Sequence, residues 1–317
     1  MKGLLKTKSA SMQFLLLICI SLVSLFFIGS LVGVIVMSAI TGINSLQILD
    51  VANLDFSKPG VITYMRGMQI FQFISLFVIP SFLCARLFST DSKKYLGFRK
   101  PSTNIYFIAG AVVMLLAIPL TGFLGELNRN VQFPAGLEKW LKEQEAGAAK
   151  QMQGMLSKHT IKDLILNIFI IAGLAAIGEE LLFRGAAQRL LIKMFKNHWA
   201  GIIVAAFLFS AMHVQFYGFL PRFALGILLG LIYWYSGSLW VAMAAHFVYD
   251  AFLLVAVYLN PASLTQENSL NLSNIAMMGI ISLALVTAIV VWMKKRSVVT
   301  YNEVYADDAI PVKDHPF

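Results

Sequence analysis

The sequence predicts an all-α integral membrane protein, a multi-pass bundle of about eight transmembrane helices. Hydrophobic residues occupy 58% of the 317 positions and charged residues only 13%. The mean hydropathy of +0.75 exceeds what a soluble domain of this size shows. Apolar segments recur along the chain at lengths near the roughly 20 residues that a helix needs to cross the hydrocarbon layer. We therefore expect one membrane domain over residues 1–296, followed by a polar tail over residues 297–317.

The expected spans are separated by polar loops or basic residues. The first span follows three lysines and is longer than the apolar region of a cleaved signal peptide, about 7 to 15 residues, so we expect a retained helix. No internal repeat is visible. The spans cover approximately residues 12–40, 64–88, 104–124, 161–194, 199–217, 219–235, 239–258 and 275–293.

The basic residues predict how the chain is oriented in the membrane. With the N-terminus in the cytoplasm, the basic clusters at 93–94, 193–196 and 294–296 all fall on the cytoplasmic side, and the opposite loop at 260–274 has no Lys or Arg. This satisfies the positive-inside rule and places both termini, including a disordered tail, in the cytoplasm. The net charge of +9 thus reports topology and does not indicate a nucleic acid partner. Short basic loops and few cysteines are typical of the bacterial plasma membrane.

Residues 126–158 form the least hydrophobic part of the body. Leu137, Trp140 and Leu141 recur there at helical spacing among charged residues. The pattern predicts either an amphipathic helix in the membrane interface or a solvated connecting helix. Cys19 and Cys84 both lie in apolar segments without metal-type spacing and are interpreted as packing residues.

The fourth span carries three ionisable residues, Glu179, Glu180 and Arg184. Each charge at bilayer depth costs about 2.5 to 3.5 kcal/mol on insertion scales, so such residues indicate function by default. Glu180 and Arg184 are four residues apart and can pair along one helix face. Glu179 points about 100° away from that face. The pair could equally be a structural tie between helices.

Two further spans bring polar residues to similar depth. His213 lies about fourteen residues beyond Trp199, or about 20 Å into the membrane, and Glu179 lies equally far from Lys193 on the preceding antiparallel span. In the seventh span, His246 and Asp250 share one helix face. A lone histidine such as His213 could be a packing residue, and the His246–Asp250 pair could belong to a proton relay.

A dry site with two imidazoles and a carboxylate can activate water. The carboxylate acts as general base, and an imidazole binds the water or the developing oxyanion. Alternatively, the same His, His and Glu residues bind a divalent metal such as zinc, whose water attacks. Neither hypothesis needs a Ser or Cys nucleophile.

Three motifs in order resemble those of the CAAX protease and bacteriocin-processing (CPBP, or Abi) family. They are Glu-Glu-x-x-x-Arg from Glu179 to Arg184, Phe-x-x-x-His from Phe209 to His213, and His-x-x-x-Asp from His246. The resemblance covers about residues 161–258. It implies an intramembrane endopeptidase similar to type II CAAX prenyl endopeptidases, sometimes described as a metalloprotease, that acts on a membrane-associated or lipidated peptide or protein reached from the bilayer.

The resemblance also implies roles for these residues. Glu179 and His213 would activate water, while Glu180 and Arg184 would orient the site. His246 and the residue four positions later would support the oxyanion.

Asp250 departs from the Asn found at its position in eukaryotic prenyl endopeptidases. An ionised Asp would repel an oxyanion. Asp250 is therefore either protonated, or an acceptor that orients His246, or a metal ligand. Because of this departure, peptide processing, cell-envelope maintenance or bacteriocin immunity are as compatible with the resemblance as cleavage of CAAX proteins.

Two other functions are compatible with these polar residues. A non-catalytic membrane scaffold or bacteriocin-immunity protein would keep the polar residues for helix packing. A proton-coupled transporter using Glu179, His213 and Asp250 is less favoured, because transporters usually carry inverted repeats, and Gly226 with Gly230 is typical of a small-residue packing face.

Overall fold

The computed structural model describes residues 2–44, 55–56, 58–264 and 271–299, and all regular structure in these residues is helical. Within these described residues, seven helices are long and apolar enough to cross a membrane, and a further apolar helix is shorter. The protein is a multi-pass helical membrane protein, as predicted. Of the predicted tail at 297–317, residues 300–317 lie outside the described residues, so the predicted domain division stays a prediction.

The long spans match the expected ones closely, because hydropathy dominates their placement. They cover Ala10–Thr41, Gly60–Phe88, Ile105–Arg129, Ile161–Phe195, Phe216–Ser236, Leu239–Leu259 and Leu272–Arg296. Several are divided into labelled parts: α1 (Ala10–Ser24) and α2 (Gly33–Thr41), α4 (Pro59–Gln72) and α5 (Ile79–Phe88), α7 (Ile105–Leu116) and α8 (Ile118–Arg129), α10 (Ile161–Asn167), α11 (Leu174–Glu180) and α12 (Arg189–Phe195).

The remaining helices complete the bundle. A short helix, α6 (Ser92–Tyr95), follows α5, and α9 (Ala135–Met155) occupies the polar region in which a helix was expected. In α9, Leu141 is buried while Leu137 and Trp140 are exposed. The last membrane helices are α13 (His198–Ala211), α14 (Phe219–Ser236), α15 (Leu239–Leu259) and α16 (Leu272–Arg296).

The fifth span differs from its prediction. Helix α13 ends at Ala211 and does not continue to residue 217; its 14 residues make a helix of about 21 Å, which is short of the hydrocarbon thickness. The chain turns where Val214 adopts a left-handed φ of 54°, and Ser210 Oγ donates to Phe219 O across the turn at 2.7 Å. His213 therefore lies in a turn beyond the helix end and not on a continuous span.

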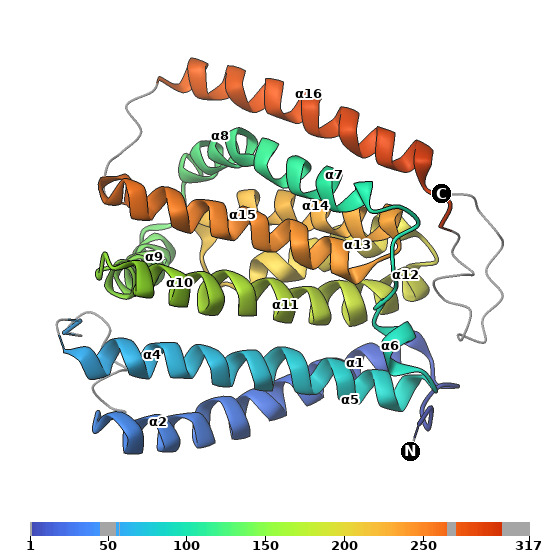
Figure 1. Cartoon of the computed structure of the whole chain (residues 1–317), viewed down its shortest axis with the longest axis horizontal. Coiled ribbons are helices and arrows are strands. Elements are labelled where there is room, and N and C mark those ends of the chain that lie inside the picture. The colour runs from blue at the N-terminus through green and yellow to red at the C-terminus, as the bar shows by residue number, and fades with distance from the viewer. Residues whose placement is uncertain (1, 45–54, 57, 265–270, 300–317) are drawn as a thin grey trace.

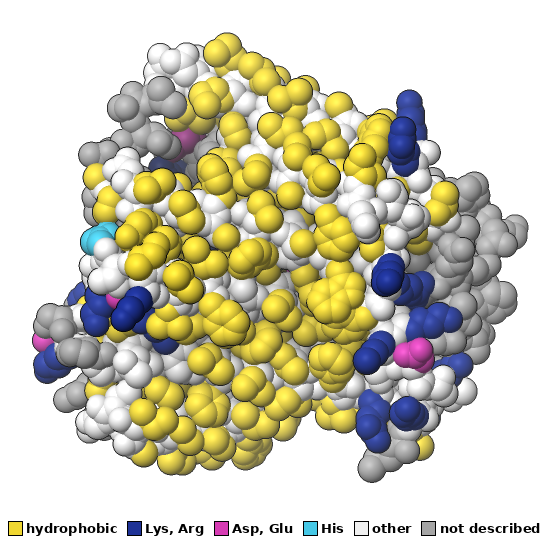
Figure 2. All heavy atoms as spheres, in the orientation of Figure 1, with side chains coloured by type: hydrophobic (Ala, Val, Ile, Leu, Met, Phe, Trp, Pro, Cys, Tyr) yellow, Lys and Arg dark blue, Asp and Glu magenta, His cyan; other side chains and the backbone are white. Residues whose placement is uncertain are grey.

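The helices lie roughly side by side in layers (Figure 1). The antiparallel pair of α1–α2 and α4–α5 packs on one side of α10–α12, while α13, α14 and α15 lie on the other side of α10–α12, and α16 forms the far edge. Hydrophobic side chains cover a broad middle band of the surface, and Lys and Arg gather toward its two ends (Figure 2). This pattern is what a protein surrounded by lipid requires, so the exposed apolar residues are the membrane-facing surface.

Candidate active site

Glu180 ends α11 and is fully buried on the side facing α14 and α15. Its Oε1 lies 2.7 Å from Arg184 Nη1, so the predicted pair is present, with both side chains at most 2% exposed. Arg184 also donates from Nη2 to Gly226 O on α14 at 2.9 Å. A buried ion pair needs such extra hydrogen bonds to offset its desolvation. The pair thus ties the fourth span to α14.

His246 reaches the same carboxylate from α15. Its Nδ1 lies 3.0 Å from Glu180 Oε1, and its Nε2 lies 3.3 Å from Asp250 Oδ2 one turn further along. With a carboxylate oxygen near each ring nitrogen, both contacts are satisfied by an imidazolium, or by a neutral ring that accepts a hydrogen bond from a protonated carboxyl group at one of its two nitrogens. Arg184, Glu180, His246 and Asp250 thus form one continuous chain of polar contacts.

Glu179 points to a different side of the helix from Glu180, as the roughly 100° between successive helical residues predicts. Its Oε1 lies 4.0 Å from His213 Nε2, and its Oε2 lies 3.9 Å from His246 Nε2. These separations are too long for direct hydrogen bonds. His213 Nδ1 lies 2.9 Å from Phe209 O; because a carbonyl only accepts, this nitrogen carries the proton and leaves Nε2 of the neutral ring as an acceptor directed at Glu179.

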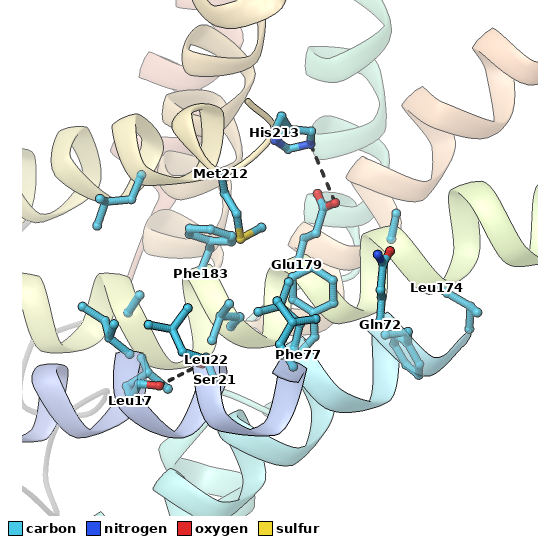
Figure 3. Close-up of a pocket in the computed structure, with 18 of the residues that line it drawn as sticks. Leu17, Ser21, Leu22, Gln72, Phe77, Leu174, Glu179, Phe183, Met212 and His213 are labelled. Atoms are coloured by element: carbon cyan, nitrogen blue, oxygen red, sulfur yellow. Dashed lines mark hydrogen bonds and ion pairs between the residues drawn. The ribbon is translucent and has the colours of Figure 1, made fainter. Parts of the chain in front are cut away.

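An apolar cavity of about 880 Å³ opens beside Glu179 and His213. Its wall is built by α1, by α4 and the π-helical segment that follows it, by the fourth span and by α13. Figure 3 shows Glu179 and His213 meeting at this wall, with Phe183 and Met212 beside them. The cavity therefore brings an apolar ligand within reach of the Glu179–His213 side of the site.

Phe209 lies at the centre of the cluster, a position that its motif spacing alone did not reveal. The Arg184 guanidinium carbon lies 4.9 Å from its ring centroid, and the rings of His213 and His246 lie edge-on at 5.2 and 6.2 Å. Its backbone carbonyl fixes His213 and its ring separates His213 from Arg184. One residue thereby positions both halves of the site.

The structure brings together all six site residues predicted from sequence, including His213 despite its different backbone setting. Sequence reasoning missed the carbonyls of Gly226 and Gly230, which accept from Arg184 and Gln188. It saw only their packing role, which also holds: a Cβ on Gly226 would lie 2.9 Å from the Ala206 Cβ. That these carbonyls accept hydrogen bonds follows from the burial of Arg184 and Gln188 against α14. The sequence does not show which helices pack against each other, so it could not reveal these contacts.

A metal was also expected as one alternative. Among the described residues, no group of three His, Cys, Asp or Glu side chains has an arrangement that could hold a metal ion. His213 and Glu179 stand 4.0 Å apart, and His246 already contacts a carboxylate with each ring nitrogen. These donors, as they are arranged, do not fit a zinc centre. The presence of a metal stays a prediction that a chelator experiment tests.

Comparison with known proteins identifies this region. Residues 161–252 match the family model described as type II CAAX prenyl endopeptidase Rce1-like. The uncharacterized protein YpbD of Bacillus subtilis (strain 168) is 35% identical over 102 residues, which cover 31% of this chain and 49% of YpbD, so the match spans about half the length of that relative. No solved structure matches the chain. Residues 161–252 are therefore similar to the Rce1-like domain of the CAAX protease and bacteriocin-processing family, the resemblance that the three motifs indicated.

Proposed function

We propose that the protein is an intramembrane endopeptidase that hydrolyses a peptide bond of a membrane-associated or lipidated substrate. The observation that carries the proposal is the pairing of Glu179 with His213 Nε2 at 4.0 Å on the wall of an apolar cavity. A single water molecule bridges polar groups at such a separation. Its protons would be held by the carboxylate and by the imidazole nitrogen, so that an oxygen lone pair faces the cavity.

The reaction follows from this arrangement. The water oxygen bonds to the carbonyl carbon while its proton passes to Glu179, the general base. The C=O π electrons move onto the carbonyl oxygen. Collapse of the tetrahedral intermediate breaks the C–N bond, and the proton held by Glu179 passes to the leaving nitrogen. The products are a carboxylic acid and an amine, and no covalent bond to the protein is needed.

The second carboxylate serves the positively charged side of the site. Glu180 holds Arg184 and His246 in place, and Asp250 accepts from the other His246 nitrogen. In this role Asp250 orients His246, whose Nε2 lies 3.9 Å from Glu179 Oε2, so that the positive charge of the imidazolium would lie near the developing oxyanion. Fixed charges of this kind act strongly where water is excluded.

Substrate access and cell location complete the proposal. The cavity wall formed by α1 and α4 suits an apolar substrate segment arriving from the bilayer, and the family resemblance suggests a peptide or protein substrate of a bacterial plasma membrane. The basic cluster in the last turn of α16 favours a cytoplasmic C-terminus.

A non-catalytic role is the alternative, and the buried Glu180–Arg184 ion pair favours it, because that pair would tie helices together without any chemistry. It would fit a scaffold or a bacteriocin-immunity protein.

The test is cleavage of a library of lipid-anchored and transmembrane peptides by the purified protein in vesicles. Wild type is compared with Glu179→Gln, each with and without a strong chelator. The proposal expects cleavage by wild type, loss in the variant and no effect of the chelator. Loss of cleavage with chelator would establish a metal. Equal cleavage by the variant would contradict the role of Glu179, and absence of cleavage in both folded proteins would favour the non-catalytic alternative.

A further inference from the structure

Two glutamines of α4 line the cavity that contains Glu179 and His213. Gln69 and Gln72 are three residues apart, so they share a helix face, and both belong to the cavity wall. In Figure 3 the carboxamide of Gln72 projects from α4 into the space beside Glu179. Among the described residues that line the cavity, these two carry a carboxamide side chain, and they lie on the wall across from the fourth span.

These two carboxamides lack good partners within the described part of the chain. Gln72 makes no side-chain hydrogen bond there; only its backbone carbonyl accepts, from Ser75. Gln69 donates weakly to the sulfur of Met155 at 3.6 Å, while its buried Oε1 has no partner. An amide without a hydrogen bond is costly in an apolar medium. A ligand that supplies both donors and acceptors would remove that cost.

Contacts on both sides hold the glutamines at this wall. Before them, Arg66 binds Asp163 at 3.1 Å and Asn167 at 2.8 Å. After them, Phe73 and Phe77 pack against Gly178, where an added Cβ would lie 2.9 and 2.8 Å from their rings.

Gly178 directly precedes Glu179. The Phe73 and Phe77 contacts therefore set α4 against the fourth span at the level of the candidate base, and Gln72 lies about one helical turn or less from that level.

The proposed reaction exposes substrate backbone groups that need hydrogen-bond partners, and carboxamides can supply these partners. A peptide bond inside a helix is shielded, so the scissile segment of a membrane substrate must be unwound. Its freed N–H and C=O groups would be energetically costly to leave without partners in an apolar cavity. A glutamine side chain offers two donors and an acceptor, the complement of a peptide group.

We propose that Gln69 and Gln72 bind the backbone of an unwound substrate segment next to the scissile bond. The occupant of the cavity is thus an extended peptide, hydrogen-bonded to α4 on one side and facing Glu179 and His213 on the other. The inference rests on the proposed peptidase function and adds a substrate-binding wall and a requirement for unwinding.

The kinetic test replaces Gln72 with Met, which keeps its length and removes the carboxamide. Ile74→Met is the matched control, because Ile74 is exposed on the same helix turn and does not line the cavity. The substrate is the library peptide that wild type cleaves fastest. We expect Gln72→Met to lower kcat/KM about tenfold, mainly through KM, and the control to stay within about twofold.

Backbone-modified peptides separate binding from structure. Each residue flanking the scissile bond is N-methylated in turn, which removes one backbone N–H. With wild type, we expect N-methylation of at least one residue to lower kcat/KM about fivefold. With Gln72→Met, we expect the same N-methylation to cause no additional loss of kcat/KM. Equal losses in both proteins at every position would overturn the inference.

A crosslinking test does not depend on cleavage. A photoreactive p-benzoylphenylalanine replaces Gln72, or Ile74 as control, in the Glu179→Gln background, and the biotin-labelled peptide library is the probe. Crosslinks from position 72 at least fivefold above position 74 support the binding wall even if no peptide is hydrolysed. Equal or no crosslinking at position 72 contradicts it.

Discussion

Glu179 and Glu180 are neighbours in sequence but belong to two different environments. The Glu180 side chain is 0% exposed and contacts Arg184 and His246. The Glu179 side chain is 13% exposed, lines the cavity and stands about 4 Å from each of two imidazoles. The Glu180 carboxylate is thus held in contacts with buried charged and polar side chains of the protein, whereas the Glu179 carboxylate borders an open cavity. The comparison teaches that a buried charge pair indicates structure, whereas a charge beside a cavity indicates chemistry.

Removing the Glu180 carboxylate should destabilise the protein, because Arg184 and His246 both lose their contact with it. Glu180→Leu leaves Arg184 buried without its counterion, so we expect the free energy of unfolding to fall by about 3–5 kcal/mol. Denaturant titration in detergent micelles measures this. The double variant Glu180→Leu with Arg184→Met, which removes both charges, should recover part of the loss. A single variant within about 1 kcal/mol of wild type would show that the pair is not structurally important.

The contact between α4 and the fourth span can be tested next. Gly178→Ala places a methyl group against Phe73 and Phe77, so we expect a loss of about 1–3 kcal/mol in unfolding free energy from overpacking. Gly122→Ala is the matched control, since a Cβ there meets nothing within 4 Å; it should be neutral or stabilise by about 0.4–1 kcal/mol. Equal effects of the two substitutions would contradict the close approach of α4.

Of the substitutions at Glu180, Gly178 and Asp250, we expect Asp250→Asn to have the smallest effect. Asn can still accept a hydrogen bond from His246 Nε2, so Asp250→Asn should lower the cleavage rate by less than about tenfold, the worth of about one hydrogen bond. Asp250→Ala removes the acceptor and should lower it further. If Asn is as damaging as Ala, the negative charge itself is required, and the orienting role assigned to Asp250 is wrong.

Much of the fold could be predicted because the bilayer imposes simple rules. Apolar length placed seven spans within a few residues of their ends, and helical spacing placed Glu180 with Arg184 and His246 with Asp250. The end of α13 could not be predicted, because the residues from Met212 to Gln215 include no Pro or Gly, and the turn depends on the contact of Ser210 with Phe219.

The cavity was also beyond sequence reasoning. It arises where α1 and α4 pack against the fourth span, and no local pattern states which helices are neighbours. Gln69 and Gln72 were visible as amides in an apolar span, and that signal alone could have marked their positions. Whether they face lipid, protein or a cavity depends on the tertiary packing of α4 against the fourth span.

The central claim is that Glu179 does the chemistry while Glu180 maintains the structure. The most direct measurement is the cleavage rate of Glu179→Gln, with its unfolding free energy taken from the same preparation. A lost general base predicts a rate about 10²- to 10⁴-fold below wild type, with stability changed by less than about 0.5 kcal/mol, as for a substitution that breaks no internal contact. A variant that cleaves at the wild-type rate, or that unfolds as readily as Glu180→Leu, would contradict the account.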